Sequence, residues 1–245
     1  MGLREQYLEA MGIEAWVPRR PAVAAQPAPP ASPRPRVPAR SAPQSLAPDW
    51  EVLRAEVQGC TRCGLARTRT QTVFGVGNRT AELLVIGEAP GADEDAQGEP
   101  FVGRAGQLLN SMLRALGAPR DTVYIANILK CRPPGNRDPS PDEVACCLPY
   151  LRRQIELVGP RLLLAVGRIA AQNLLATDTP IGKLRGRVHE FGEAGLPLIV
   201  TYHPAYLLRS PGEKRKAWGD LKFVREELRR RRRTGVEAGG GGPPA

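Results

Sequence analysis

Five cysteines are the residues of this chain whose spacing points most directly to chemistry. Cys60 and Cys63 form a C-x-x-C pair, Cys131 lies far downstream, and Cys146 and Cys147 are adjacent. Two intervening residues allow both thiolates of a C-x-x-C pair to reach one metal centre. Four thiolates suit zinc or an iron–sulfur cluster, and the spacing alone does not distinguish them. The sequence therefore predicts a metal centre that joins an N-terminal segment to a distant part of the chain.

A second set of polar residues follows the ends of predicted strands. Glu88 comes just after the apolar run ELLVI, Asn127 ends the run VYIAN, and His203 follows the run LIVTY. In open parallel sheets the ligand site lies beyond the carboxyl ends of the strands. We therefore expect a carboxylate, an amide and an imidazole at this edge of the sheet.

The apolar runs that position these residues alternate with helical patterns. Strands are predicted at 82–86, 123–129, 161–166 and 196–201, and helices at 103–117, 141–158, 168–175 and 212–232. Ser140 is a suitable N-cap for the second helix, and Pro141 suits its first position. Strands alternating with helices indicate a parallel sheet covered on both faces. The predicted fold is α/β, a three-layer α/β/α domain with a central, mostly parallel four-stranded sheet.

Composition divides the chain into four segments. Residues 21–48 contain nine prolines and few residues worth burying, which is typical of a disordered linker. The folded domain is predicted at 49–234, a Gly- and Pro-rich disordered tail at 235–245, and a short segment too small to fold alone at 1–20.

The charge balance favours a polyanionic partner. Lys and Arg number 35 against 25 Asp and Glu, which indicates nucleic acid first and an acidic membrane surface second. A basic tail on an ordinary enzyme is the alternative, because part of the excess lies in the run 229–233. No apolar stretch is long enough to span a bilayer and no secretory signal is recognisable, so we expect no membrane association and a cytoplasmic protein with reduced thiols.

Three motifs together resemble the family-4, iron–sulfur uracil-DNA glycosylases. They are GEAPG…ED…G-x-PFVG, N-x-x-KCRPPGNR-x-P and HPAYLLR, and the resemblance covers about residues 50–228. It implies an enzyme that removes uracil from single- or double-stranded DNA and leaves an abasic site, acting as a monomer. A non-catalytic DNA-binding module that kept the same fold is the alternative.

The resemblance also implies a role for each motif residue. Glu88 belongs to the water-activating loop, Asn127 reads the Watson–Crick edge of uracil, and His203 faces uracil O2. Phe101 stacks on the base, with Ala89 and Pro90 beside it in the uracil pocket. The implied DNA contacts are Leu207 or Leu208 as a wedge in the duplex and Arg209 on a phosphate. The basic loop 182–187, with Lys183 and Arg185, tracks DNA phosphates or is simply a solvated turn, and His189 is expected in a surface turn.

For the cysteines, the resemblance implies a [4Fe–4S] cluster. Its ligands would be Cys60, Cys63, Cys131 and Cys147, with Cys146 as a spare thiol.

The first motif departs from that of the family-1 uracil-DNA glycosylases, which reads GQDPYH. Ala89 stands at the Asp position and Gly91 at the Tyr position. Either Glu88 or the pair Glu94 and Asp95 must then supply the catalytic carboxylate. We favour Glu88 because it lies at the strand end itself.

The pattern of apolar residues in the N-terminal segment indicates that it binds a partner protein. Residues 3–20 carry Leu8, Met11, Ile13 and Trp16, and short apolar helices on arms commonly dock in a partner's groove. The pattern YLEAMGIEAW resembles the N-terminal peptide of the psi subunit of bacterial DNA polymerase III. The arm is therefore a candidate docking peptide for the replication machinery, or else it packs on the domain.

Overall fold

The computed structural model describes residues 47–237, with side chains from 49 to 233. All of these fall within the compact unit Pro43–Ala245. The predicted docking peptide 1–20, nearly all of the predicted linker and most of the predicted tail lie outside the described residues. No helix in the described part of the chain is long and apolar enough to cross a membrane.

In these residues a six-stranded sheet forms the centre of the fold, in the order β1-β3-β2-β4-β6-β5. The bounds are β1 Val76–Gly77, β2 Leu83–Gly87, β3 Tyr124–Asn127, β4 Leu162–Val166, β5 His189–Phe191 and β6 Leu196–Thr201. The four central strands are mutually parallel, whereas β1 and β5 pair antiparallel at the two edges. The predicted mostly parallel sheet is confirmed, but the prediction of four strands is wrong. The two missed strands are short edge strands that lack an apolar run.

Helices connect and cover the strands. Their bounds are α2 Ala47–Gln58, α3 Ala92–Gln97, α4 Arg104–Leu116, α5 Pro141–Val158, α6 Arg168–Leu175, α7 Ile181–Leu184, α8 Pro204–Arg209 and α9 Lys214–Glu237, with 3-10 turns at Gly64–Arg67, Pro134–Asn136 and Pro211–Glu213. The predicted helices 141–158 and 168–175 are confirmed to the residue. The capping box of Ser140 and Glu143 and the first-position proline begin α5 where the sequence predicts.

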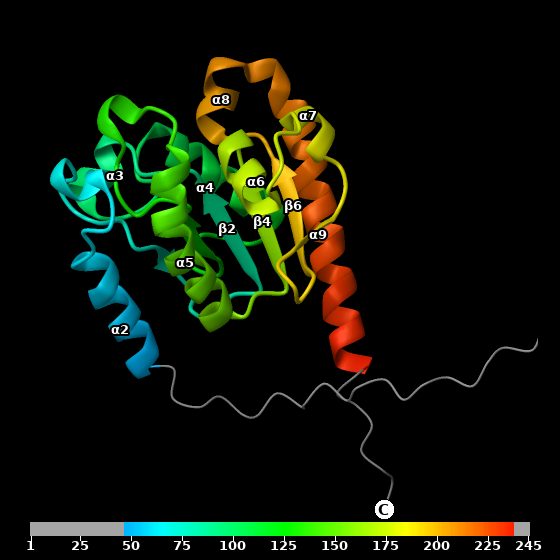
Figure 1. The fold of residues 1–245 in the computed structure, drawn as a ribbon. Coiled ribbons are helices and arrows are strands. Elements are labelled where there is room, and N and C mark those ends of the chain that lie inside the picture. Colours follow the sequence, from blue (N-terminus) through cyan, green and yellow to red (C-terminus); the bar gives the residue numbers. More distant parts are fainter. Residues whose placement is uncertain (1–46, 238–245) are drawn as a thin grey trace, which may run out of the picture. The chain divides into compact units, whose positions relative to one another are not determined.

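Successive residues of each central strand face opposite layers, and both faces are buried. On β2, Leu84 and Ile86 pack in one core with Trp50 of α2 and Leu151 of α5. The alternate residues of the same strand pack in a second core with α4 and α9. Figure 1 shows α5 and α6 in front of β2 and β4, and α9 running beside β6. The three-layer α/β/α architecture is therefore confirmed.

Candidate functional site

The carboxyl ends of β2 and β3 lie side by side and bring the first site residues together. Gly87 and Asn127 are register partners in the parallel pair. A Cβ on Gly87 would lie 2.4 Å from Oδ1 of Asn127 and 2.6 Å from Cζ of Phe101. Only glycine leaves room for these two side chains to meet over the strand end.

The amide of Asn127 is buried and incompletely bonded. Its residue is 2 % exposed, and Oδ1 finds no hydrogen-bond partner among the described residues. A buried polar atom without a partner costs free energy, and such atoms mark sites where a ligand supplies the missing bond. Because Asn127 lines the cleft described below, its free oxygen is available to a bound molecule.

Phe101 is held in an unusual backbone conformation by two neighbouring side chains. Its φ is 56°, in the left-handed region that non-glycine residues rarely adopt. Glu94 accepts backbone N–H bonds from Gly91, Val102 and Gly103 at 3.1, 3.0 and 3.2 Å. Arg120 donates to the carbonyl of Pro100 at 2.6 Å. These contacts fix the loop so that the ring of Phe101 lies 5.7 Å from the ring of His203.

The carboxylate of Glu88 differs from those of Glu94 and Asp95. Burial, with the nearby negative charge of Asp138, raises the pKa of Glu88 to about 7, although Arg168 opposes the shift. Glu94 is occupied by three backbone amides, and Asp95 accepts the backbone N–H of Thr70 at 3.0 Å. Of the three candidates, Glu88 is the one whose carboxylate does not serve to tie loops together.

His203 is the N-cap residue of α8 and is fixed in one tautomer. Its Nδ1 accepts the backbone N–H of Ala205 at 3.1 Å, so Nδ1 carries no proton. Burial, together with the positive charge of Arg209, lowers the pKa of His203 to about 4. The imidazole is therefore neutral near pH 7, and its proton is on Nε2.

These side chains line one cleft of about 750 Å³. All six predicted uracil-binding residues lie in it: Glu88, Ala89, Pro90, Phe101, Asn127 and His203. The cleft also contains Asp138, Arg168, Tyr202 and Tyr206, which the sequence analysis did not assign. Arg168 lies two residues after the end of β4, so the strand-end rule that found Glu88 could have found it.

The predicted DNA contacts on α8 differ in their exposure to solvent. Leu208 is 36 % exposed and Arg209 lines the cleft, but Leu207 is 1 % exposed and packs in the core. Of the two predicted wedge residues, only Leu208 can reach a partner, because α8 turns Leu207 inward.

The predicted basic loop is partly structural. Lys183 is exposed on α7, whereas Arg185 donates to both carboxylate oxygens of Asp220, at 2.7 and 3.0 Å. Its guanidinium is thus neutralised inside the fold. The prediction that His189 lies in a surface turn is wrong, because His189 is the first residue of β5. Its Nε2 lies 2.7 Å from the carbonyl oxygen of Leu184.

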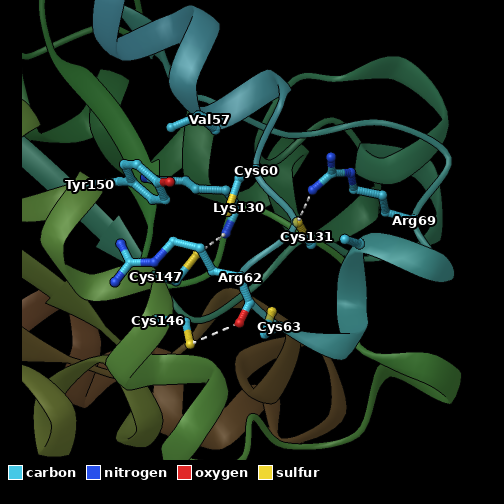
Figure 2. A pocket seen from close by; sticks show the side chains of 11 residues that line it. Val57, Cys60, Arg62, Cys63, Arg69, Lys130, Cys131, Cys146, Cys147 and Tyr150 are labelled. Carbon is cyan, nitrogen blue, oxygen red and sulfur yellow. Dashed lines mark hydrogen bonds between the residues drawn. The ribbon is translucent and has the colours of Figure 1, made fainter.

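The cysteines gather around a separate cavity (Figure 2). All five lie in the described residues, are free thiols and line this cavity. The Sγ of Cys131 accepts a hydrogen bond from Arg69 at 3.1 Å, and the Sγ of Cys147 accepts one from the backbone N–H of Lys130 at 3.2 Å. Cys146 instead donates to the carbonyl of Arg62 at 3.4 Å. N–H donors directed at sulfur suit thiolates that carry negative charge.

As they stand, residues 47–237 contain no group of three or more His, Cys, Asp or Glu side chains placed to hold a metal ion. The five thiols nevertheless line one and the same cavity.

Comparison with known proteins agrees with this geometry. Residues 74–222 match the uracil DNA glycosylase superfamily. The chain is 46 % identical over 177 residues to the type-4 uracil-DNA glycosylase of Archaeoglobus fulgidus, covering 70 % of this chain and 89 % of that protein. It is 43 % identical over 161 residues to the type-4 uracil-DNA glycosylase of Thermotoga maritima, covering 65 % and 83 % of the two chains. A type-5 uracil-DNA glycosylase of Thermus thermophilus is 32 % identical over 153 residues, or 54 % of this chain and 68 % of that one. The chain therefore belongs to the uracil DNA glycosylase superfamily and, within it, to the type-4 group.

Proposed function

We propose that this protein is a DNA repair enzyme that hydrolyses the N-glycosidic bond between uracil and deoxyribose. It would release uracil and leave an abasic site in an intact strand. The type-4 relatives carry the name uracil-DNA glycosylase, which supports this reaction. The observation that carries the proposal is the meeting of Glu88, Asn127, Phe101 and His203 around one cleft.

Recognition of uracil rests on Phe101 and Asn127. An enzyme that acts on a base must take it out of the stack into a pocket. In the proposed complex the base lies against the Phe101 ring, and the unpaired Oδ1 of Asn127 accepts uracil N3–H while its amide N–H donates to O4. Cytosine presents the reverse pattern at these two positions, so the same amide orientation disfavours it.

Cleavage separates two charges that His203 and Glu88 are suited to stabilise. The N1–C1′ bond breaks with its electron pair on uracil, C1′ gains positive character, and a water oxygen bonds to C1′. The Nε2–H of neutral His203 donates to uracil O2, where negative charge collects. The carboxylate of Glu88 orients the water and accepts its proton.

The alternative is a non-catalytic DNA-binding module of the same fold. A module that only binds a polyanion gains nothing from a half-buried carboxylate in its cleft. A carboxylate with a raised pKa in a cleft is typical of a catalytic group. This feature supports the enzyme.

We also propose that Cys60, Cys63, Cys131 and Cys147 hold a [4Fe–4S] cluster. Their shared cavity and the N–H donors on two of the sulfurs support this ligand set. When bound, the cluster would tie the segment before β2 to the loop after β3 and to α5. A protein with such ligands belongs in the cytoplasm, where thiols stay reduced.

The test is uracil release by purified, cluster-replete protein from single- and double-stranded oligonucleotides that contain one uracil. We expect alkali-labile abasic sites from the wild type and a large loss for Asn127→Ala, with Asn78→Ala, an exposed asparagine, as the matched control. Tight binding of uracil-containing DNA without any abasic product would instead identify a binding module.

A partner for residues 3–20 is proposed from their sequence alone. The arm would recruit a monomeric enzyme to the replication machinery, where newly incorporated uracil appears. Deleting residues 1–20 should leave oligonucleotide cleavage unchanged and abolish pulldown of purified clamp-loader subunits. A loss of intrinsic turnover or of melting temperature would show that the arm belongs to the domain.

A further inference from the structure

Tyr206 is an aromatic residue of the cleft that the proposed mechanism leaves without a role. It is 37 % exposed although it lines the cleft, and it lies on α8, three residues after His203. Its backbone N–H donates to the carbonyl of His203 at 2.9 Å. Because residues three apart share a helix face, Tyr206 adjoins the uracil-binding residues.

The ring of Tyr206 packs against side chains that are themselves held by further contacts. It packs on Tyr202, with ring centroids 5.1 Å apart and planes inclined by 45°. The guanidinium of Arg185 lies over the ring of Tyr202, 4.2 Å from its centroid. Asp220, which also accepts a 2.7 Å hydrogen bond from Thr201, holds Arg185 with two hydrogen bonds. An exposed ring on such a support loses little conformational entropy when a ligand packs against it.

We propose that Tyr206 is the platform of a second nucleobase subsite, on which the base next to the extruded uracil stacks in single-stranded DNA. The inference rests on the proposed function and adds a substrate contact to it. Aromatic rings on which successive bases stack, beside cations for the backbone, are the usual means of binding single strands. Arg209, exposed in the same cleft, supplies the cation. In a single strand the neighbouring base has no pairing partner and is free to stack on protein.

Another exposed aromatic provides a contrast within the same chain. Trp218 on α9 is 40 % exposed, but it does not line the cleft. Exposure alone therefore does not make a subsite, and Trp218 serves as the control position.

The experiment measures dissociation constants for single-stranded oligonucleotides that carry one non-cleavable 2′-fluoro-deoxyuridine. In one series the bases on either side of the uracil are present, and in the other each is replaced in turn by an abasic tetrahydrofuran residue. The proteins are the wild type, Tyr206→Ala, Tyr206→Leu, Tyr206→Phe and Trp218→Ala. Uracil release by the wild type from a cleavable version is measured first, so failure of the proposed function is recognised separately.

Tyr206→Ala and Tyr206→Leu should weaken binding by between about 5-fold and about 100-fold, the range expected for loss of one stacked base. Tyr206→Phe and Trp218→Ala should bind as the wild type does. Removing the neighbouring base on one side should weaken wild-type binding by a similar factor and have no further effect on Tyr206→Ala, because both changes remove the same contact.

Two results would overturn the subsite while leaving the glycosylase proposal intact. One is that the wild-type dissociation constant stays the same when either neighbouring base is removed. This measurement does not depend on the folding of any variant. The other is additive effects of base removal and Tyr206→Ala, which would mean that the ring and the base do not touch.

Discussion

The ammonium group of Lys130 donates a 2.9 Å hydrogen bond to the backbone oxygen of Asn127. The same group donates to Oε1 of Gln154 at 2.6 Å, and the backbone N–H of Lys130 donates to the Sγ of Cys147 at 3.2 Å. Lys130 is 1 % exposed, and burial lowers its pKa to about 8. One buried residue thus connects the strand end that carries Asn127 with the cysteine cavity.

Lys130→Met should lower uracil release by more than it weakens binding of uracil-containing DNA. The change leaves the carbonyl of Asn127 and Oε1 of Gln154 buried without their donor, and each such loss costs about 1–3 kcal/mol. The Asn127 amide would then be less well positioned. Melting temperature, single-turnover rate and affinity should be compared with those of Lys222→Met, which changes an exposed lysine of α9. Equal losses in rate and affinity would make Lys130 a stability residue only.

Glu88 should control the pH dependence of cleavage. Its pKa is raised to about 7, and the proposed mechanism needs the ionised form. The single-turnover rate should therefore fall about tenfold per pH unit below pH 7 and level off above it. His203, with a pKa of about 4, stays neutral over this range and adds no second step. Glu88→Gln should be slow and independent of pH, and a wild-type profile flat from pH 5 to 8 would contradict the assignment.

Substituting two neighbours of Glu88 should shift the midpoint of the pH–rate profile in opposite directions. Asp138 raises the pKa of Glu88 and Arg168 lowers it. Asp138→Asn should therefore shift the pH–rate midpoint to lower pH, and Arg168→Gln should shift it to higher pH. Shifts of the same sign in both variants would mean that breaking the 2.7 Å Arg168–Asp138 ion pair matters through structure and not through charge.

His203→Ala should slow cleavage about 100- to 1000-fold with little effect on DNA affinity, as expected when a pre-placed donor to developing charge is lost. The chain offers a matched control in its other histidine, since His189 is bonded to the carbonyl of Leu184 and lies outside the cleft. His189→Ala should cleave at the wild-type rate. A comparable loss in both variants would remove His203 from the mechanism.

The sequence predicts those parts of the fold that local pattern determines. The four central strands are buried on both faces, so each reads as a continuous apolar run, and α5 carries its own capping residues. The edge strands β1 and β5 are only two and three residues long and pair with β3 and β6, which lie far away in the sequence or carry the signal themselves, so they show no apolar run of their own. Glu88, Asn127 and His203 each lie at or just after the end of a strand with a clear apolar run, so the sequence predicts that they lie together. The Arg185–Asp220 ion pair joins residues 35 positions apart, and no local pattern predicts it. The choice between Leu207 and Leu208 depends on how α8 packs, which two adjacent leucines do not reveal.

Cys147 and Cys146 should respond in opposite ways to substitution by serine, a residue of nearly the same size. Cys147 is 6 % exposed, and its sulfur accepts the N–H of Lys130, a bond suited to a thiolate that ligates iron. The sulfur of Cys146 instead lies 3.4 Å from the carbonyl oxygen of Arg62. We therefore expect Cys147→Ser to lose iron and the visible absorbance of an iron–sulfur cluster, and Cys146→Ser to retain both. Because a bound cluster stabilises only the folded state, the melting temperature of Cys147→Ser should fall as well. Iron retained in Cys147→Ser and lost in Cys146→Ser would reassign the fourth ligand to Cys146, and zinc in place of iron in the wild type would contradict the cluster itself.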